Sequence, residues 1–249
     1  MIRALAYSSA RRGHVATPTF LLVHGAWHGA WCWQRLGRVL DERAMPWAAL
    51  DLPSSTSGDP TVDMNDDVAE LRRVAGDIGP VVLVAHSYAG AVVTEAAPAI
   101  DDLRGIVYVA ALVPRLGQTA SDVTREYGRR SRLDETIRRD EGMLRLEPAP
   151  ASLALYGDCD EDTRTWAIDQ ISAQTFASFR TARTSPDAAV TSTYVICGRD
   201  QALPPPVQEA IALRCDDVVR LDSDHSPFLS HPGLLADVLA TRRFSPRVK

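Results

Sequence analysis

Long apolar runs, closely spaced cysteines and a strong excess of charge are all missing from this 249-residue sequence. No apolar stretch approaches the roughly 20 residues that a membrane-spanning helix needs, so we expect no membrane anchor. The first 18 residues contain no continuous apolar segment of the kind found in a signal peptide. We therefore interpret 1–18 as a flexible N-terminal tail.

The charge balance and the cysteines exclude further classes of protein. A formal charge of −5, from 27 basic and 32 acidic residues, argues against a nucleic-acid or membrane-surface binder. The four cysteines lack the close spacing of metal sites and disulfide frameworks, so we expect no metal and free thiols in a reducing cytoplasm. They are Cys32, Cys159, Cys197 and Cys215. Lysine is nearly absent while arginine and alanine are abundant, a composition typical of a GC-rich bacterial genome.

What the chain does contain is an alternation of short apolar runs with helical patterns. Hydrophobic residues make up 45% of the chain, enough for the core of one larger domain. The expected strands cover 19–24, 47–50, 81–85, 106–110, 192–197 and 218–221, and the clearest helices cover 64–78, 88–97, 205–214 and 232–240. Strands that alternate with helices predict an α/β fold with a mostly parallel sheet flanked by helices.

The alternation stops between about 113 and 188. This stretch is strongly charged at first, then helical in character, and it contains no clear strand. Long insertions after a sheet strand tend to cover functional sites. We therefore predict a helical cap over 113–188, inserted into a core formed by 19–112 and 189–249. The alternative is that these helices simply pack on the sheet surface.

One serine stands at the end of an expected strand. The apolar run 81–84 leads into Ser87, and small residues, Ala85 and Ala89, lie two positions away on either side. A strand that turns sharply into a helix in this way exposes the serine hydroxyl at the carboxyl end of the sheet. Such elbows usually have glycine at both flanking positions, so the match is imperfect. The alternative interpretation is a serine that merely caps a helix.

A serine nucleophile needs a base, and the base needs an acid to orient it. Asp200 directly follows the strand 192–197, and His225 lies in the loop after the strand 218–221. Serine, acid and histidine in this order, each after a separate strand, are typical of α/β-hydrolases. We therefore predict Ser87, Asp200 and His225 as a catalytic triad. The alternative acids are Asp222 and Asp224, and the alternative bases are His24 and His86.

The reaction also needs two backbone N–H groups that stabilise an oxyanion. Tyr88, directly after the serine, offers one, and Ala26, in the turn after the first strand, offers the other. The predicted substrate pocket contains Trp27, His28, Tyr156 and Trp166. The last two side chains fit packing within the cap equally well. A pocket with these aromatic side chains would favour a medium-sized apolar or aromatic acyl group.

Four blocks of the sequence resemble the plant methylesterase and hydroxynitrile lyase group of α/β-hydrolases and its bacterial relatives. They are FLLVHGAWHGAWCW, VVLVAHSYAGAVV, YVICGRDQALPPPVQ and DSDHSPFLSHP. The segment LYGDCDEDTRTWAIDQISAQTFASF is similar to the cap of the bacterial members. The resemblance runs from about Thr19 to Leu239. It implies an α/β-hydrolase fold without the first strands, a helical cap, no cofactor, and the same triad and oxyanion donors.

Three functions remain open from the sequence. The first is a carboxylesterase that cleaves a small-molecule ester through an acyl-enzyme, as a monomer or homodimer. The second is a cyanohydrin lyase, but the resembling lyases have a lysine after the catalytic histidine and a threonine in the oxyanion loop. This chain has Ser226 and Gly25 at those places. The third is a ligand-binding protein that uses the same scaffold without hydrolysis.

Overall fold

The structure is a computed structural model that describes residues 17–126, 131–242 and 244. The predicted flexible tail, 1–18, thus falls almost entirely outside the described residues. Across those described ranges, every helix is too short or too polar to cross a membrane.

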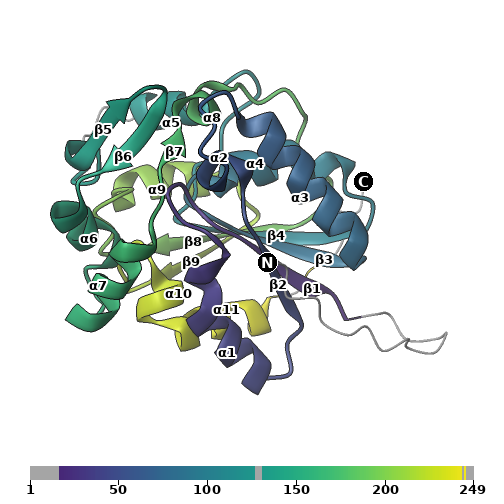
Figure 1. The fold of residues 1–249 in the computed structure, drawn as a ribbon. Coiled ribbons are helices and arrows are strands. Elements are labelled where there is room, and N and C mark those ends of the chain that lie inside the picture. The colour runs from purple at the N-terminus through teal and green to yellow at the C-terminus, as the bar shows by residue number, and fades with distance from the viewer. Residues whose placement is uncertain (1–16, 127–130, 243, 245–249) are drawn as a thin grey trace.

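A six-stranded parallel sheet forms the centre of the molecule (Figure 1). Its strands are β1 (Thr19–Val23), β2 (Trp47–Leu50), β3 (Val81–His86), β4 (Leu103–Val109), β8 (Ser192–Cys197) and β9 (Asp217–Leu221). In space they follow the order β2-β1-β3-β4-β8-β9. From β1 the chain continues to β2 at one edge of the sheet. From β3 it continues through β4 and β8 to β9 at the other edge. Such a reversal opens a crevice at the carboxyl ends of the two strands, where α/β proteins bind ligands.

Helices cover both faces of this sheet and confirm the predicted α/β fold. α1 (Gln34–Glu42) and α11 (Pro232–Thr241) pack together on one face, and α3 (Met64–Ile78) and α4 (Ala89–Ala96) pack together on the other (Figure 1). The remaining core helices are α2 (Pro53–Thr56), α9 (Pro205–Ala212), α10 (Pro227–Ser230), η1 (Ala30–Trp33) and η2 (Ala97–Ala99). Because both faces are covered, the central strands are built from nearly continuous runs of valine, leucine and isoleucine.

The helix α3 illustrates how local sequence sets these elements. Asp63 accepts a hydrogen bond from the Asn65 amide at 2.7 Å, while the Asp66 side chain accepts one from the Asp63 amide at 2.9 Å. This reciprocal capping box satisfies amides that the first helical turn leaves free. The helix ends at Gly79, whose φ of 93° favours glycine. Its buried face consists mainly of Met64, Val68, Leu71, Val74 and Ala75.

The segment between β4 and β8 contains strands as well as helices, so the expectation of no strand there is wrong. β5 (Ile137–Asp140), β6 (Met143–Leu146) and β7 (Gln174–Thr175) form an antiparallel sheet. The helices of this segment are α5 (Ala120–Glu126), η3 (Asp134–Thr136), α6 (Pro148–Tyr156), α7 (Glu161–Gln170) and α8 (Phe176–Arg180). Exposed charges in β5 hide its strand pattern. The local signal is the two-residue turn Glu141 and Gly142, where both φ angles are positive, at 45° and 82°.

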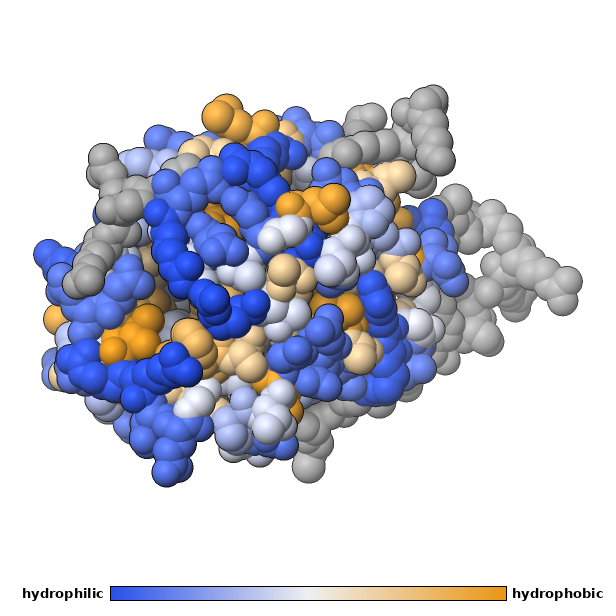
Figure 2. All heavy atoms as spheres, turned by 90° about the horizontal axis from the view of Figure 1, so that it is seen from above, coloured by the Kyte–Doolittle hydropathy of each residue, from blue (hydrophilic) through white to orange (hydrophobic). Residues whose placement is uncertain are grey.

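Most large apolar side chains of the inserted segment are buried or half-buried, whereas Leu116, Leu153 and Trp166 are exposed. Figure 2 shows the molecule from above, and this face is mainly hydrophilic with small, separate apolar patches. The buried apolar residues of the segment include Leu133, Leu144, Leu146 and Ala151. Because these side chains face the core, the insertion shields one side of the crevice from solvent.

We predict that Gly90→Ala in α4 destabilises the fold. A Cβ at this position would lie 2.3 Å from the backbone oxygen of Leu112, which cannot move independently of the chain. We expect a loss of about 1–3 kcal/mol in the free energy of unfolding, measured by urea denaturation. The matched control is Gly76→Ala on the exposed side of α3, where a Cβ meets nothing within 4 Å. This control should gain about 1 kcal/mol from helix propensity. Equal stability of Gly90→Ala and the wild type would contradict the packing argument.

Candidate active site

Ser87 occupies a strained turn between β3 and α4. Its φ is 53°, in the left-handed region that serine rarely adopts, and its side chain is partly exposed between buried neighbours. The Ser87 amide donates to the Val109 carbonyl at 3.1 Å, and the Ser87 carbonyl accepts from the Leu112 amide at 2.9 Å. These bonds to the end of β4 hold the strained conformation in place. The hydroxyl is thereby presented at the carboxyl edge of the sheet, as the sequence predicted.

The loop after β1 passes directly beside this serine. A Cβ on Gly25 would lie only 2.9 Å from the Ser87 Cβ, so the close approach requires glycine. Within the described part of the chain, neither the Ala26 amide nor the Tyr88 amide donates to a protein acceptor. Both predicted oxyanion donors are therefore available beside the nucleophile.

Two buried histidines fix the orientation of this loop. His24 donates from Nδ1 to the Gly25 carbonyl at 2.8 Å, and its Nε2 accepts from the Leu52 amide at 2.9 Å. His28 donates from Nδ1 to the Ala26 carbonyl at 2.8 Å. A carbonyl held on one side of a peptide directs its N–H to the other. Since Gly25 supplies the carbonyl of the peptide that carries the Ala26 N–H, His24 sets the direction of that donor.

Asp200 and His225 form a buried hydrogen-bonded pair. The His225 Nδ1 lies 2.6 Å from Asp200 Oδ2, and the two residues are 1% and 4% exposed. Asp200 Oδ1 accepts from the amides of Ala202 and Leu203 at 2.7 and 2.8 Å. The carboxylate thus holds the imidazole with Nδ1 protonated, which leaves Nε2 free to accept a proton. No hydrogen bond joins Ser87 to His225 in this structure, although such bonds often tighten only when substrate is bound.

The alternative acids and bases have other contacts. Asp222 is exposed and forms an ion pair with Arg199. Asp224 accepts hydrogen bonds from the Ser226 amide at 3.1 Å, the Ser230 hydroxyl at 2.8 Å and the Asp158 amide at 3.0 Å. His86 donates from Nε2 to the His225 carbonyl at 3.0 Å. Burial lowers the pKa of His86 well below the usual value, so this ring supports the histidine loop as a neutral group.

A cavity of about 230 Å³ opens onto both Ser87 and His225. More than half of the residues around it come from the inserted segment. Its lining consists of Trp27, Ser87, Leu112, Ser121, Thr124, Leu133, Asp134, Ile137, Leu144, Phe176, Phe179, Ala202, Leu203 and His225. Most of these side chains are apolar. The cavity therefore suits an apolar group attached to the atom that the serine attacks.

Of the four predicted pocket residues, only Trp27 lines this cavity. His28 and Tyr156 are buried beside it, where the Tyr156 hydroxyl lies 2.8 Å from His28 Nε2. Burial lowers the pKa of His28 to about 3, so its neutral ring accepts this hydrogen bond. Trp166 packs edge-on against Trp31 with ring centroids 5.3 Å apart, at a separate surface groove. Tyr156 on α6 thus contacts the loop after β1, and Trp166 on α7 lies at the surface. Neither side chain lines the cavity.

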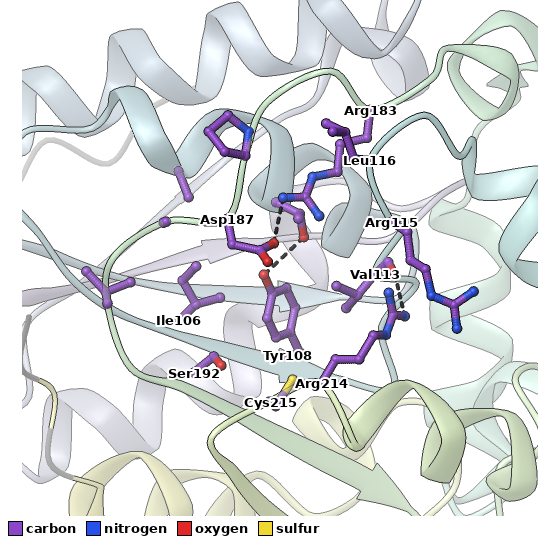
Figure 3. Close-up of a pocket in the computed structure, with 15 residues that line it drawn as sticks. Ile106, Tyr108, Val113, Arg115, Leu116, Arg183, Asp187, Ser192, Arg214 and Cys215 are labelled. Atoms are coloured by element: carbon purple, nitrogen blue, oxygen red, sulfur yellow. Dashed lines mark hydrogen bonds and ion pairs between the residues drawn. The ribbon is translucent and has the colours of Figure 1, made fainter. Parts of the chain in front are cut away.

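A second cavity, of about 390 Å³, lies elsewhere and contains none of the predicted triad residues (Figure 3). Arg183 and Asp187 form an ion pair at 2.6 Å on one side of it, and Arg214 donates to the Val113 carbonyl at 2.6 Å on the other. The larger volume does not make it the reaction site, because it brings together no nucleophile, base and acid. Of these two cavities, the smaller one is lined by the predicted nucleophile and base.

Sequence reasoning missed Gln208, which holds the acid. Its Nε2 donates to Asp200 Oδ2 at 2.9 Å, and its Oε1 accepts from the Cys197 amide at 2.9 Å. Gln208 is fully buried on α9, among apolar neighbours. The sequence did contain a signal for this role. Gln208 is a polar residue on the apolar face of the helix that follows Asp200.

A parallel sheet with a strained serine after one strand and a histidine–aspartate pair after two others defines an α/β protein with hydrolase-like geometry. The chain belongs to the alpha/beta hydrolase family, whose family model matches residues 20–238. Its relatives include proteins named methylesterase 7, from Arabidopsis thaliana, and methyl jasmonate esterase 1, from Vitis vinifera.

The most similar relatives include proteins from fungi, plants and bacteria. An α/β-hydrolase of Aspergillus novofumigatus is 28% identical over 240 residues, which cover 89% of this chain and 95% of that protein. Methylesterase 7 of Arabidopsis thaliana is 29% identical over 252 residues, covering 88% and 94%. The crystal structure of a pyrethroid hydrolase from Sphingobium faniae JZ-2 superposes with a TM-score of 0.76 at 23% identity, covering 90% and 96%. This last match shows a shared fold.

We predict that Asp200→Asn lowers kcat by about 10⁴-fold while the protein stays folded, because the amide cannot stabilise the histidine cation or fix its tautomer. The control is Asp222→Asn, an exposed carboxylate in the histidine loop, which should keep wild-type kcat. Asp224→Asn should affect thermal stability more than kcat, because its bonds hold the loop. A nearly wild-type rate for Asp200→Asn would show that the acid lies elsewhere.

Proposed function

We propose that this protein hydrolyses a carboxylic ester through an acyl-enzyme on Ser87. The observation that supports this proposal is that one apolar cavity opens onto both Ser87 and His225, with Asp200 directly behind the histidine. A nucleophile, a base and an acid in this relation are suited to acyl transfer. The names of several relatives, among them methyl jasmonate esterase 1 of Vitis vinifera, agree with ester hydrolysis.

The proposed reaction has two halves. In the first, the Ser87 hydroxyl attacks the ester carbonyl while His225 Nε2 takes its proton. The amides of Ala26 and Tyr88 stabilise the oxyanion, and the leaving alcohol receives the proton from His225. In the second half, His225 activates a water that releases the acid and restores Ser87. Asp200 stabilises the histidine cation in both halves.

The cavity favours hydrolysis over cyanohydrin cleavage. Where the resembling lyases have a lysine, this chain has Ser226, which is fully buried. In the described ranges, the cavity lining contains no lysine or arginine that would stabilise a cyanide anion. Among the described residues that line the cavity, Asp134 is the one charged side chain besides the proposed catalytic groups, and it should disfavour an anionic substrate.

We predict that Ser87→Ala abolishes hydrolysis of p-nitrophenyl acetate and leaves the fold intact. Removing the nucleophile of such a triad costs at least about 10⁴-fold in kcat. Circular dichroism and thermal unfolding serve as the control for folding. In parallel, a fluorophosphonate should label the wild type at Ser87 and leave the variant unlabelled. If the variant keeps more than a tenth of the activity, the proposed nucleophile is wrong.

We also predict that lengthening the acyl chain from acetate to butyrate raises kcat/KM by about fourfold per methylene, since each buried methylene contributes about 0.8 kcal/mol. The gain should stop once the acyl group fills the cavity. A hemisuccinate ester of the same alcohol, which adds a carboxylate near Asp134, should be a poorer substrate than butyrate. A rate that is independent of acyl length would mean that the acyl group does not occupy this cavity.

A further inference from the structure

A buried hydrogen-bond network connects the two chain segments that carry the oxyanion donors. It runs from the Tyr88 side chain through Asp67 and Ser54 to Gln174, and from there to the backbone of Trp27. All four side chains that form it are at most 1% exposed. None of these four side chains lines the cavity beside Ser87.

The first end of the network holds the residue after the nucleophile. The Tyr88 hydroxyl donates to Asp67 Oδ2 at 2.7 Å. The same carboxylate accepts from the Ser54 hydroxyl at 2.5 Å and from the Ser54 amide at 2.9 Å. The Tyr88 ring also packs against Phe179, with centroids 5.0 Å apart. Tyr88 is thus anchored by its side chain while its amide is directed toward the site.

The second end holds the loop after β1. Gln174 donates from Nε2 to the Ser54 hydroxyl at 2.8 Å and accepts from the Trp27 amide at Oε1, at 3.3 Å. Trp27 has a φ of 64°, which is unusual for a bulky residue and must be enforced by its surroundings. Its amide belongs to the same peptide as the Ala26 carbonyl. Gln174 and His28 therefore fix this peptide from opposite sides.

We propose that Asp67, Ser54 and Gln174 are positioning residues that set the two oxyanion-hole amides, those of Tyr88 and Ala26, relative to each other. This inference rests on the proposed function, because it assigns a role to the oxyanion hole of that reaction. Preorganised donors are effective only when they are held at the place where negative charge develops. A network that ties both loops to one buried carboxylate supplies this rigidity.

Burial of the Asp67 carboxylate in its charged form lowers the stability of the fold. Burial raises the pKa of Asp67 to about 6, although the hydroxyl and amide of Ser54 and the Tyr88 hydroxyl favour the charged form. An aspartate in the unfolded chain has a pKa of about 3.9, so the folded protein binds this proton more tightly. Stability is therefore lost as pH rises from about 4 to about 6 and is not regained above. The charge of Asp66, beside it on α3, also raises the pKa of Asp67, and the neutral Tyr88 hydroxyl faces it from the start of α4.

The test is Tyr88→Phe, which removes only the hydroxyl that reaches Asp67 and keeps the ring and the backbone amide. We expect kcat for p-nitrophenyl acetate to fall about tenfold and KM to change less than about twofold, because the oxyanion forms only in the transition state. Inhibition by 2,2,2-trifluoroacetophenone should weaken by the same factor as kcat/KM. Its carbonyl carbon bonds to the Ser87 oxygen, whose proton passes to His225, and the resulting alkoxide occupies the oxyanion hole. Binding of benzyl alcohol, which is neutral, lacks a carbonyl and forms no such adduct, should not change.

The matched control is Tyr108→Phe, which removes the hydroxyl of another buried tyrosine, 3.0 Å from the Thr94 hydroxyl and outside the network. It should keep wild-type kcat. Ser54→Ala should lower kcat as Tyr88→Phe does, and the double variant should lose less than the product of the two single losses. Wild-type kcat in Tyr88→Phe, or equal losses in Tyr88→Phe and Tyr108→Phe, would overturn the proposal.

Asp67→Asn separates positioning from simple support of the fold. It should lower kcat, while its melting temperature relative to the wild type rises between pH 5 and pH 7, because the variant lacks the buried charge. A kcat loss that follows the loss of folded protein would overturn the positioning role. The two proposals also fail separately. An active Ser87→Ala contradicts the nucleophile, whereas an inactive Ser87→Ala with a fully active Tyr88→Phe contradicts the network alone.

Discussion

The left-handed backbone at Ser87 is the constraint on which the rest of the site depends. A non-glycine residue in such a conformation costs on the order of 1–3 kcal/mol and persists only where its surroundings enforce it. Two neighbours at the same sheet edge share this property, since Trp27 after β1 and Ala110 after β4 also have positive φ. Strain is thus concentrated at the carboxyl ends of the three central strands. Bonds from Ser87 to the end of β4, and the absence of side chains at Gly25 and Gly90, maintain it.

The inserted segment does more than cover the cavity. The Trp27 indole donates to the Leu144 carbonyl at 3.0 Å, and the Trp27 carbonyl accepts from the Ser172 amide at 2.9 Å. Tyr156 reaches the same loop through His28. The segment that lines much of the cavity is therefore bonded to the loop that carries the proposed oxyanion donor Ala26. Changes that reshape the cavity for a different substrate would also disturb this loop.

The sequence predicted well those features that depend on local pattern. The bounds of β2, β8 and α3 match the expected ones, because apolar runs and capping residues act within a few positions. Ser87, Asp200 and His225 could be predicted as a triad because each follows a strand whose end the sequence pattern marks. The cavity lining could not be predicted, since it depends on how the insertion folds back over the sheet. Tyr156 and Trp166 are aromatic and lie in that insertion, yet their helices face the loop and the surface, while Phe176 and Phe179 face the cavity.

The three neutral histidines around Ser87 also affect how the whole molecule responds to acid. Burial lowers the pKa of His24, His28 and His86 below that of an exposed histidine. Below about pH 6.5 these rings bind protons in the unfolded chain but stay neutral in the folded protein. The free energy of unfolding therefore decreases as the pH falls. The rings that hold the oxyanion loop and the histidine loop thereby couple the shape of the site to the global stability of the fold. In mild acid, these three rings at the centre of the molecule would therefore lower the stability of the fold, because they take up protons only on unfolding.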